Sequence, residues 1–232
     1  MRKLLLLVLL FSLFSALLQN TLYNIALEIR FDREGIENEE FRENFYCEEM
    51  RENRENLSDV CSSFLSAVER DICYFPIPLS AVDESLGISY VDSWMGERNY
   101  KGKGVHEGTD IMADRNERGL YPVVSISDGT VTNLGWLEKG GYRIGITSPS
   151  GVYFYYAHLE SYAEIEKGDR VIAGQLLGFM GDSGYGEEGT VGQFPVHLHL
   201  GIYSFKEGKE ISVNPYYVLL ALEDKKLKYY YI

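Results

Sequence analysis

From residue 79 onward the chain consists of short runs of β-branched and aromatic residues, separated by Gly and other turn residues. This pattern indicates a β fold, because such short, interrupted runs suit strands joined by turns rather than helices. The clearest run is Val196–Tyr203, in which apolar residues alternate with other types. The 18 Tyr and 23 Gly of the 232-residue chain agree with this class. We therefore predict a mainly β, antiparallel domain over residues 79–215.

Two turn signals inside this region predict hairpins. Asp128-Gly129 separates two apolar runs, and Asp-Gly is a strong signal for a two-residue hairpin turn. Ser148–Gly151 separates the runs Tyr142–Thr147 and Val152–His158. We expect the two runs that flank each turn to pair with one another.

Residues 1–27 predict a secretory signal peptide or a membrane anchor. Arg2 and Lys3 precede the uncharged, largely apolar run Leu4–Leu18, in the order of the first two parts of an export signal. As a helix this run would be about 22 Å long, shorter than the roughly 30 Å hydrocarbon core of a bilayer. No clear small-residue cleavage site follows, so cleavage and anchoring stay alternatives. Both place the remaining chain outside the cytoplasm, either secreted or anchored to the cytoplasmic membrane.

Residues 28–75 form a charged segment whose apolar positions recur at spacings of three and four, which predicts a helical spacer. Between Glu28 and Asp71 this segment carries 14 acidic and 6 basic residues. Pro76 and Pro78 then end the helical pattern. We interpret the spacer either as a solvated stalk or as a partner-binding helix outside the membrane. A second helical pattern near the C-terminus predicts a helical tail over residues 216–232.

The acidic composition excludes one class of function. The formal net charge is −13, from 22 basic and 35 acidic residues. A nucleic-acid-binding protein neutralises phosphates with a basic surface, and the sequence shows no sign of one. We expect no nucleic-acid partner.

The four histidines fall at three places in the β domain, and two of them share one strand. His197 and His199 lie in Val196–Tyr203, where successive side chains point to opposite faces. The apolar residues of this strand therefore share the core face, and the two imidazoles project together from the other face. His158 ends an aromatic run, and the same alternation places it on the face of Tyr156.

His106 and Asp110 supply a second pair of metal-ligand types. A catalytic zinc site needs three N or O ligands and one open position for water. His106, Asp110 and one of the two strand histidines provide that set, with two imidazoles and one carboxylate. Two histidines then remain for proton transfer or for stabilising an oxyanion. The residues alone do not choose between His197 and His199 as the third ligand.

This arrangement resembles the lysostaphin or LytM-type zinc endopeptidases of bacterial cell walls, over about residues 105–203. Their pattern is His-x-x-x-Asp, then a His that closes an aromatic strand, then His-x-His on a later strand. Here it is carried by His106–Asp110, His158 and His197–His199. Framing elements of the family are also similar, at Asp128–Val131, Lys167–Val171, Gly174–Gly178 and Gly181–Gly184.

The resemblance implies a lysostaphin-like, duplicated-hybrid-motif fold with one Zn²⁺ ion per domain. It implies His106, Asp110 and His199 as the zinc ligands. His158 and His197 would be the catalytic pair, which orients or deprotonates the water and stabilises the oxyanion. The implied activity is hydrolysis of peptide bonds in peptidoglycan, in stem-peptide cross-links or interpeptide bridges.

Two alternatives compete with this activity. A catalytically silent member of the same fold would serve as a scaffold or activator in a cell-envelope complex, but all five site positions are present. The run Gly168–Gln175 is similar to biotinyl- or lipoyl-carrier domains, yet no Lys occurs between Arg170 and Ser204 to carry the cofactor. The loop of residues 184–195 is longer and more acidic than in many relatives, which leaves the choice of substrate open.

Overall fold

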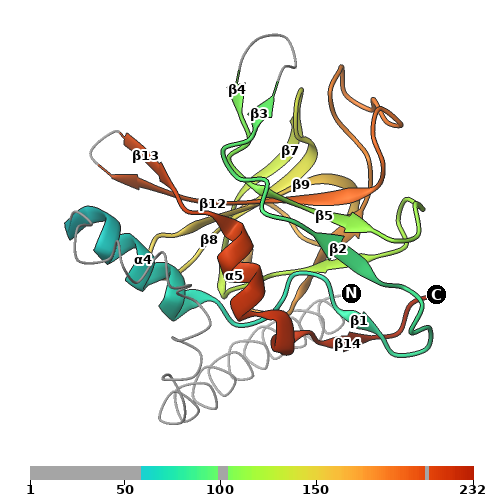
Figure 1. Ribbon diagram of the computed structural model, residues 1–232, viewed down its shortest axis with the longest axis horizontal. Coiled ribbons are helices and arrows are strands. Elements are labelled where there is room, and N and C mark those ends of the chain that lie inside the picture. Colours follow the sequence, from blue (N-terminus) through green and yellow to red (C-terminus); the bar gives the residue numbers. More distant parts are fainter. Residues whose placement is uncertain (1–58, 99–103, 207–208) are drawn as a thin grey trace, which may run out of the picture. The chain divides into compact units, whose positions relative to one another are not determined.

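The computed structural model describes residues 59–98, 104–206 and 209–232, and the expected N-terminal signal or anchor lies outside these ranges. Among the residues that the structure describes, no helix is long and apolar enough to cross a membrane. The described elements (Figure 1) are α4 (Asp59–Asp71), β1 (Leu79–Ser80), β2 (Ile88–Tyr90), β3 (Glu97–Arg98), β4 (Gly104–Val105), β5 (Thr109–Ala113), β6 (Pro122–Val124), β7 (Gly129–Leu137), β8 (Gly141–Thr147), β9 (Tyr153–Tyr162), β10 (Arg170–Val171), β11 (Leu176–Met180), β12 (His197–Lys206), β13 (Lys209–Ser212), α5 (Pro215–Ala221), the 3₁₀ helix η1 (Glu223–Lys225) and β14 (Lys228–Tyr229).

Ten of the strands form one antiparallel sheet, which confirms the predicted mainly β class. Its main path runs in the order β10, β7, β8, β9, β12, β5 and β2. β11 pairs with both β9 and β6, and β13 pairs with β12. β12 therefore lies between β9 and β5, so side chains from these three strands meet on each face of the sheet.

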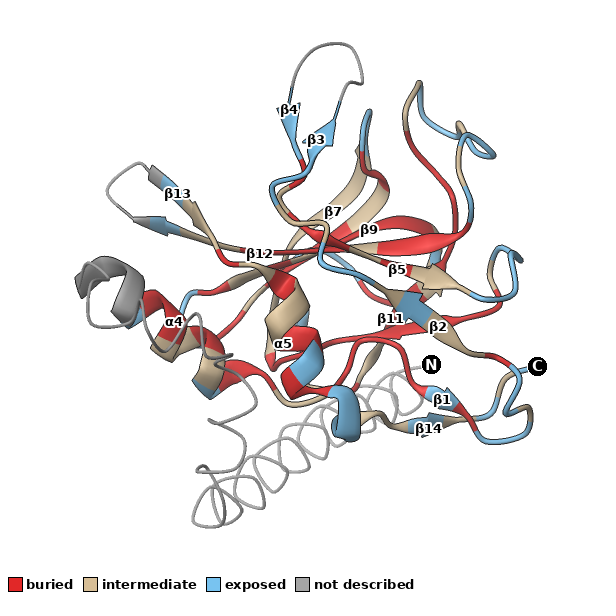
Figure 2. Cartoon of the chain, viewed as in Figure 1, coloured by how far each residue is buried: buried red, intermediate tan, exposed pale blue. Residues whose placement is uncertain are grey.

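β12 has the two faces that the alternation of its sequence predicts. Val196, Leu198, Leu200 and Ile202 are at most 1% exposed, and they form part of the core. Figure 2 shows the middle of β12 and much of β9 as buried. His199 lies on the opposite face, as its ring contact with Tyr155 of β9 shows.

His158 does not lie on the face that alternation predicts. Its backbone φ is +61°, in the left-handed region that residues other than Gly rarely adopt. At the same place β9 has one more residue than β8 between successive cross-strand pairs, which is a β-bulge. The bulge turns the His158 ring toward His199, with ring centroids 6.0 Å apart, whereas Tyr156 stays fully buried in the core.

The turn at Ser148–Gly151 joins the paired strands β8 and β9, as predicted, but Asp128-Gly129 does not form a hairpin. β6 pairs with β11, and β7 pairs with β8 and β10. The Asp128 carboxylate accepts a hydrogen bond from the Ala173 amide at 2.7 Å. An added Cβ at Gly129 would lie 2.5 Å from the Thr147 carbonyl oxygen. Asp128 and Gly129 therefore lie where the chain passes from β6 to β7, two strands that pair with different partners. The Asp-Gly pattern alone does not distinguish this connection from a hairpin.

The helix α4 packs on the β domain, so the domain starts before the predicted boundary at residue 79. The Asp71 carboxylate accepts hydrogen bonds from the Ser150 amide and hydroxyl at 3.1 and 2.9 Å. The helix ends at Asp71, before Pro76 and Pro78, and the packing continues beyond it. The buried side chains of α4 and the segment after it include Phe64, Leu65, Val68, Ile72, Phe75 and Ile77. Residues 28–58 of the expected spacer lie outside the described residues.

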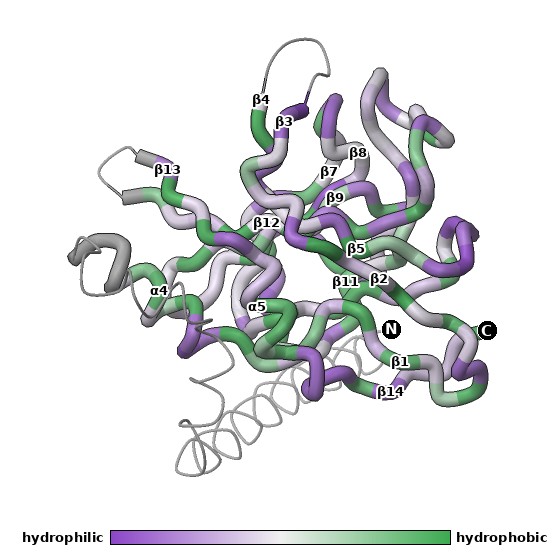
Figure 3. The backbone as a smooth tube through the Cα atoms, viewed as in Figure 1, coloured by the Kyte–Doolittle hydropathy of each residue, from purple (hydrophilic) through white to green (hydrophobic). Residues whose placement is uncertain are grey.

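The C-terminal segment is helical only at its start. Asn214 caps α5 by accepting a hydrogen bond from the Tyr216 amide at 3.0 Å, and Pro215 suits the first turn. Figure 3 shows hydrophobic residues on both α5 and α4. After η1 the chain becomes extended, and β14 pairs in parallel with β1. The predicted helical tail over residues 216–232 is therefore wrong beyond residue 225, because a short apolar pattern does not reveal pairing with a distant strand.

Candidate active site

Three side chains from two neighbouring strands and the connection before them meet on the open face of the sheet. Asp110 of β5 is the cross-strand partner of His199 of β12, and His106 precedes β5. His106 Nε2 lies 3.0 Å from Asp110 Oδ1 and 2.9 Å from His199 Nδ1. His199 Nδ1 lies 2.9 Å from the same Asp110 oxygen. The structure therefore brings together all three residues that the resemblance implies as ligands.

Backbone contacts set the orientation of the His106 ring. Its Nδ1 lies 3.0 Å from the Ser93 carbonyl oxygen, which only accepts, so Nδ1 carries the proton and Nε2 the lone pair. The neighbouring backbone is held by the Tyr203 hydroxyl, which donates to the Glu107 carbonyl at 2.6 Å. His106 thus presents a lone pair to Asp110 and His199.

Gly108 allows His199 to approach the segment that carries His106. An added Cβ at Gly108 would lie 2.3 Å from His199 Cε1 and 2.7 Å from the Leu200 carbonyl oxygen. The second of these atoms is backbone, so a side chain at this position would force the segment or β12 to move. The position requires glycine because of close approach, not because of its φ.

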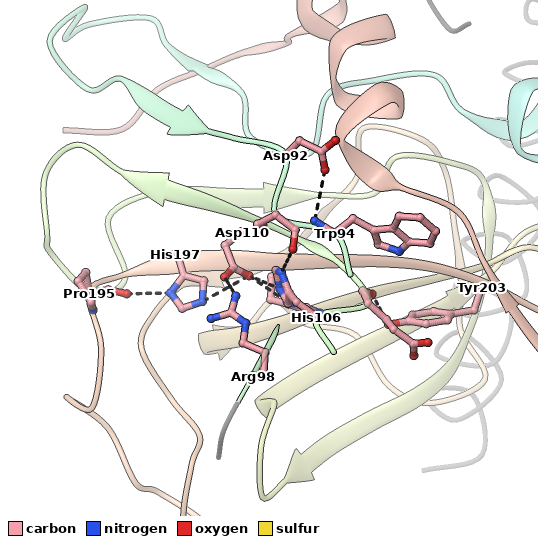
Figure 4. Close-up of polar contacts among 11 residues, drawn as sticks. Asp92, Trp94, Arg98, His106, Asp110, Pro195, His197 and Tyr203 are labelled. Carbon is pink, nitrogen blue, oxygen red and sulfur yellow. Dashed lines mark hydrogen bonds and ion pairs between the residues drawn. The ribbon is translucent and has the colours of Figure 1, made fainter. Parts of the chain in front are cut away.

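Arg98 completes the surroundings of Asp110, and no motif in the sequence marks it as a site residue. Arg98 Nη2 donates to Asp110 Oδ2 at 2.6 Å (Figure 4), while Oδ1 faces the two histidines. Burial raises the pKa of the Asp110 carboxyl, but its close contacts with the His106 and His199 ring nitrogens outweigh burial and hold the pKa well below its ordinary value. Asp110 is therefore a carboxylate throughout the physiological pH range.

His158 and His197 lie side by side next to this triangle, with ring centroids 4.7 Å apart. His158 Nδ1 lies 2.7 Å from the Ser183 carbonyl oxygen, and His197 Nδ1 lies 2.8 Å from that of Pro195 (Figure 4). Each ring therefore donates from Nδ1 and keeps its lone pair on Nε2. His197 Nε2 is 3.8 Å from Asp110 Oδ1, which places one of these lone pairs at the edge of the triangle.

Aromatic residues from the loop of residues 184–195 shield the two rings. Phe194 contacts His158 and His197 at centroid distances of 4.7 and 4.9 Å, and Tyr185 stacks on His158. Burial, helped by the charges of neighbouring histidines, lowers the pKa of His158 to about 3. Burial also lowers the pKa of His197, although the Asp110 charge opposes it. Both rings are neutral at pH 7 and can accept a proton.

The triangle fits a metal ion with nitrogen and oxygen ligands. In the described part of the chain, His106, Asp110 and His199 form a group whose ligand atoms lie within 4.8 Å of one another. Tetrahedral ligands at the usual distances from zinc lie about 3.3 Å apart, close to the separations of 2.9–3.0 Å found here. Two imidazole nitrogens and one carboxylate oxygen are a donor set that zinc accepts, with a fourth position left for water or substrate.

Comparison with known proteins places this fold and site in a family. A model of peptidase family M23 matches residues 104–215, which include all five predicted site residues. A crystal structure of a LytM-type protein from Ruminococcus gnavus is 59% identical and superposes with a TM-score of 0.69. The match covers 79% of this chain and 74% of that one. The chain belongs to peptidase family M23.

Two further relatives of this M23 chain are much longer than the shared region. The L-Ala–D-Glu endopeptidase of Bacillus subtilis is 43% identical over 150 residues, which are 64% of this chain and 43% of that protein. The glycyl-glycine endopeptidase ALE-1 of Staphylococcus capitis is 38% identical over 84 residues, which are 35% of this chain and 22% of that protein. The chain thus spans less than half the length of both relatives. The M23 match also starts after Arg98, so this residue is assigned from the structure alone.

Proposed function

We propose that this M23 chain is a zinc-dependent endopeptidase that hydrolyses peptide bonds in bacterial peptidoglycan. The observation that carries the proposal is the triangle of His106 Nε2, Asp110 Oδ1 and His199 Nδ1 beside two buried, neutral imidazoles. His106, Asp110 and His199 would hold one zinc ion. A zinc ion there supplies Lewis acidity toward the substrate carbonyl and toward the attacking water.

His158 and His197 move the protons of the reaction in this proposal. One Nε2 takes the proton that the water loses as its oxygen bonds to the carbonyl carbon. The same proton is then available for the nitrogen of the leaving amine when the C–N bond breaks. The Ser183 and Pro195 carbonyls support this exchange, because each accepts from Nδ1 and stabilises the imidazolium that forms on the way.

The substrate class is taken from the relatives, and two bond types remain candidates. One relative is an L-Ala–D-Glu endopeptidase and the other a glycyl-glycine endopeptidase. We propose that the bond lies in a stem peptide or in an interpeptide bridge. A peptidase of the cell wall must reach its substrate, so we also propose that residues 1–27 export the chain or anchor it to the membrane. We further propose that residues 28–75 bind an envelope protein partner.

Digestion of purified peptidoglycan by the full chain tests this function. Mass spectrometry of the released fragments is expected to show new peptide termini that identify the bond. The His199→Ala protein serves as the matched control, and it is expected to release none. If the zinc-loaded protein released no new termini, the proposed activity would be wrong, and a scaffold or activator role would replace it.

A further inference from the structure

Arg143 lies on the same face of the sheet as His199, two strands away. The face is established by the register: Gly145 pairs with Tyr155, which in turn pairs with Gly201 of β12. Arg143 is two residues before Gly145, so its side chain projects from the same face. The alternate residues of β8, Ile144 and Ile146, are fully buried on the other side.

One cross-strand row connects Arg143 with the candidate metal ligands. Asp110 pairs with His199, and His199 pairs with Ala157. Arg143 stands opposite the bulge that contains Ala157, and Gly135 of β7 is its partner on the far side. Two inter-strand spacings separate the Arg143 and His199 backbones, or about 9–10 Å.

Two nitrogens of the Arg143 guanidinium are buried without a partner, although the residue as a whole is only half-buried. Its Nε and Nη1 atoms are inaccessible to solvent and have no hydrogen-bond partner among the described residues. No described carboxylate forms an ion pair with it, although the protein carries a net charge of −13. A guanidinium stays protonated at every accessible pH, so burial leaves its donors unsatisfied and costs stability. An anionic ligand that accepts hydrogen bonds from these donors would remove this cost.

The surroundings of Arg143 leave room for such a partner. An added Cβ at Gly135, directly across from Arg143, would meet no atom within 4 Å. Tyr153 and Tyr155 of β9 lie near the guanidinium, whose charge acts on both hydroxyls. The Asn133 amide donates to the Tyr153 hydroxyl at 3.2 Å, so this side of the site is polar as well as aromatic.

We propose that Arg143 binds a carboxylate of the peptide substrate and selects peptides that carry one near the scissile bond. This inference rests on the proposed peptidase function and names its substrate class. A guanidinium fork binds a carboxylate through two parallel, charge-assisted hydrogen bonds, which Nε and a terminal nitrogen can provide. An extended peptide advances about 3.3–3.6 Å per residue. The carboxylate therefore lies within about three residues of the bond that is cut, and an uncharged glycine peptide is a poor substrate.

A matched pair of substrates tests the inference on the full chain. The pair is a synthetic peptidoglycan stem peptide with free carboxylates and the same peptide with its carboxylates converted to carboxamides. The unmodified protein is expected to prefer the acid peptide by about 10- to 100-fold in kcat/KM, the range of hydrogen bonds to charged groups. Arg143→Gln is expected to bring this ratio close to one, and Arg143→Lys to retain part of it. Arg115→Gln removes an exposed arginine that pairs with Glu117, and it is expected to leave the ratio unchanged.

Calorimetry of both peptides with the His197→Ala protein measures binding without turnover. It therefore tests the carboxylate site independently of the peptidase activity. Tighter binding of the acid peptide, lost on combining His197→Ala with Arg143→Gln, supports the carboxylate site even if no cleavage is observed. Equal affinities for the two peptides would overturn it, even in an active peptidase. A ratio that survives Arg143→Gln would also overturn it. Circular dichroism melts of the Arg143 variants show whether a loss of the preference for the acid peptide comes from unfolding.

Discussion

Arg98 and Asp110 form an ion pair of 2.6 Å between Nη2 and Oδ2, on the side of the carboxylate away from His106 and His199. The guanidinium therefore fixes which oxygen faces the triangle and leaves Oδ1 as the ligand atom. Partners that orient a ligand in this way commonly contribute about 10- to 100-fold to metal affinity.

Replacing Arg98 is accordingly expected to weaken metal binding without unfolding the domain. Arg98→Gln should raise the Kd for zinc by about 10- to 100-fold, and Arg98→Lys by less, because the charge remains. Competition with a chromophoric chelator measures this affinity. Arg115→Gln is the control, since Arg115 is similarly exposed and lies on another surface ion pair. An unchanged zinc affinity in Arg98→Gln would show that the pair does not hold the carboxylate.

The second prediction concerns the glycine beneath His199. In Gly108→Ala the new Cβ would overlap the His199 ring and the Leu200 carbonyl, so β12 and the His106 segment must separate. We expect destabilisation of about 1–3 kcal/mol and a lower zinc affinity. Gly104→Ala is the matched control, because its Cβ would meet only the Arg98 carbonyl at 3.8 Å. Denaturant unfolding and zinc titration of both variants check this, and equal behaviour would rule out the clash.

The third prediction separates the ligands from the proton carriers. His106→Ala, Asp110→Ala and His199→Ala are each expected to remove bound zinc and activity together. His158→Ala and His197→Ala are expected to retain zinc while turnover falls by about 100-fold or more, the range of general acid–base catalysis. Metal content after dialysis and fragment release from peptidoglycan measure the two effects. Full turnover by His158→Ala would refute its assigned role.

The fold is predictable from the sequence where a single physical rule determines the local structure. The alternation in β12 predicts its two faces correctly because one face packs in the core, so any other register would move the histidines into the core and Leu198 and Leu200 out of it. Alternation fails at His158, where a bulge and a left-handed backbone change the face of one residue. The hairpin predicted at Asp128-Gly129 is also absent, because the strands β6 and β7 on either side pair with distant partners rather than with one another.

Neither Arg98 nor Arg143 could be predicted as a site residue from the sequence, and the reasons differ. Arg98 lies in the two-residue strand β3, both of whose residues are exposed, so no hydrophobic pattern marks its position. Arg143 follows the usual alternation of β8, but its significance depends on the missing partners of its guanidinium. Such partners belong to the tertiary structure, and neither spacing nor composition reports them.

The fourth prediction is a loss of stability in acid that originates at His158. Its pKa is about 3 in the folded protein and about 6.5 when unfolded, so the unfolded state binds the extra proton between these values. Stability is therefore fully present above pH 6.5 and is lost as the pH falls toward 3. For the metal-free protein this loss is on the order of 2 kcal/mol between pH 7 and pH 5. Denaturant unfolding at both pH values should show a smaller loss for His158→Gln, and an equal loss would contradict the assignment.

The fifth prediction tests whether the loop of residues 184–195 tunes the catalytic pair. Phe194 contacts both His158 and His197, so Phe194→Ala is expected to admit water and raise the pKa of both rings toward the ordinary value. The acid limb of the pH–rate profile should then move to higher pH, because the proton carriers must be neutral to accept a proton. NMR titration of the imidazole protons in the metal-free protein measures the same shift directly. Val191→Ala, in the same loop but with a partly exposed side chain, should leave both readouts unchanged. If Phe194→Ala also left them unchanged, the shielding would have to come from the sheet rather than from the loop.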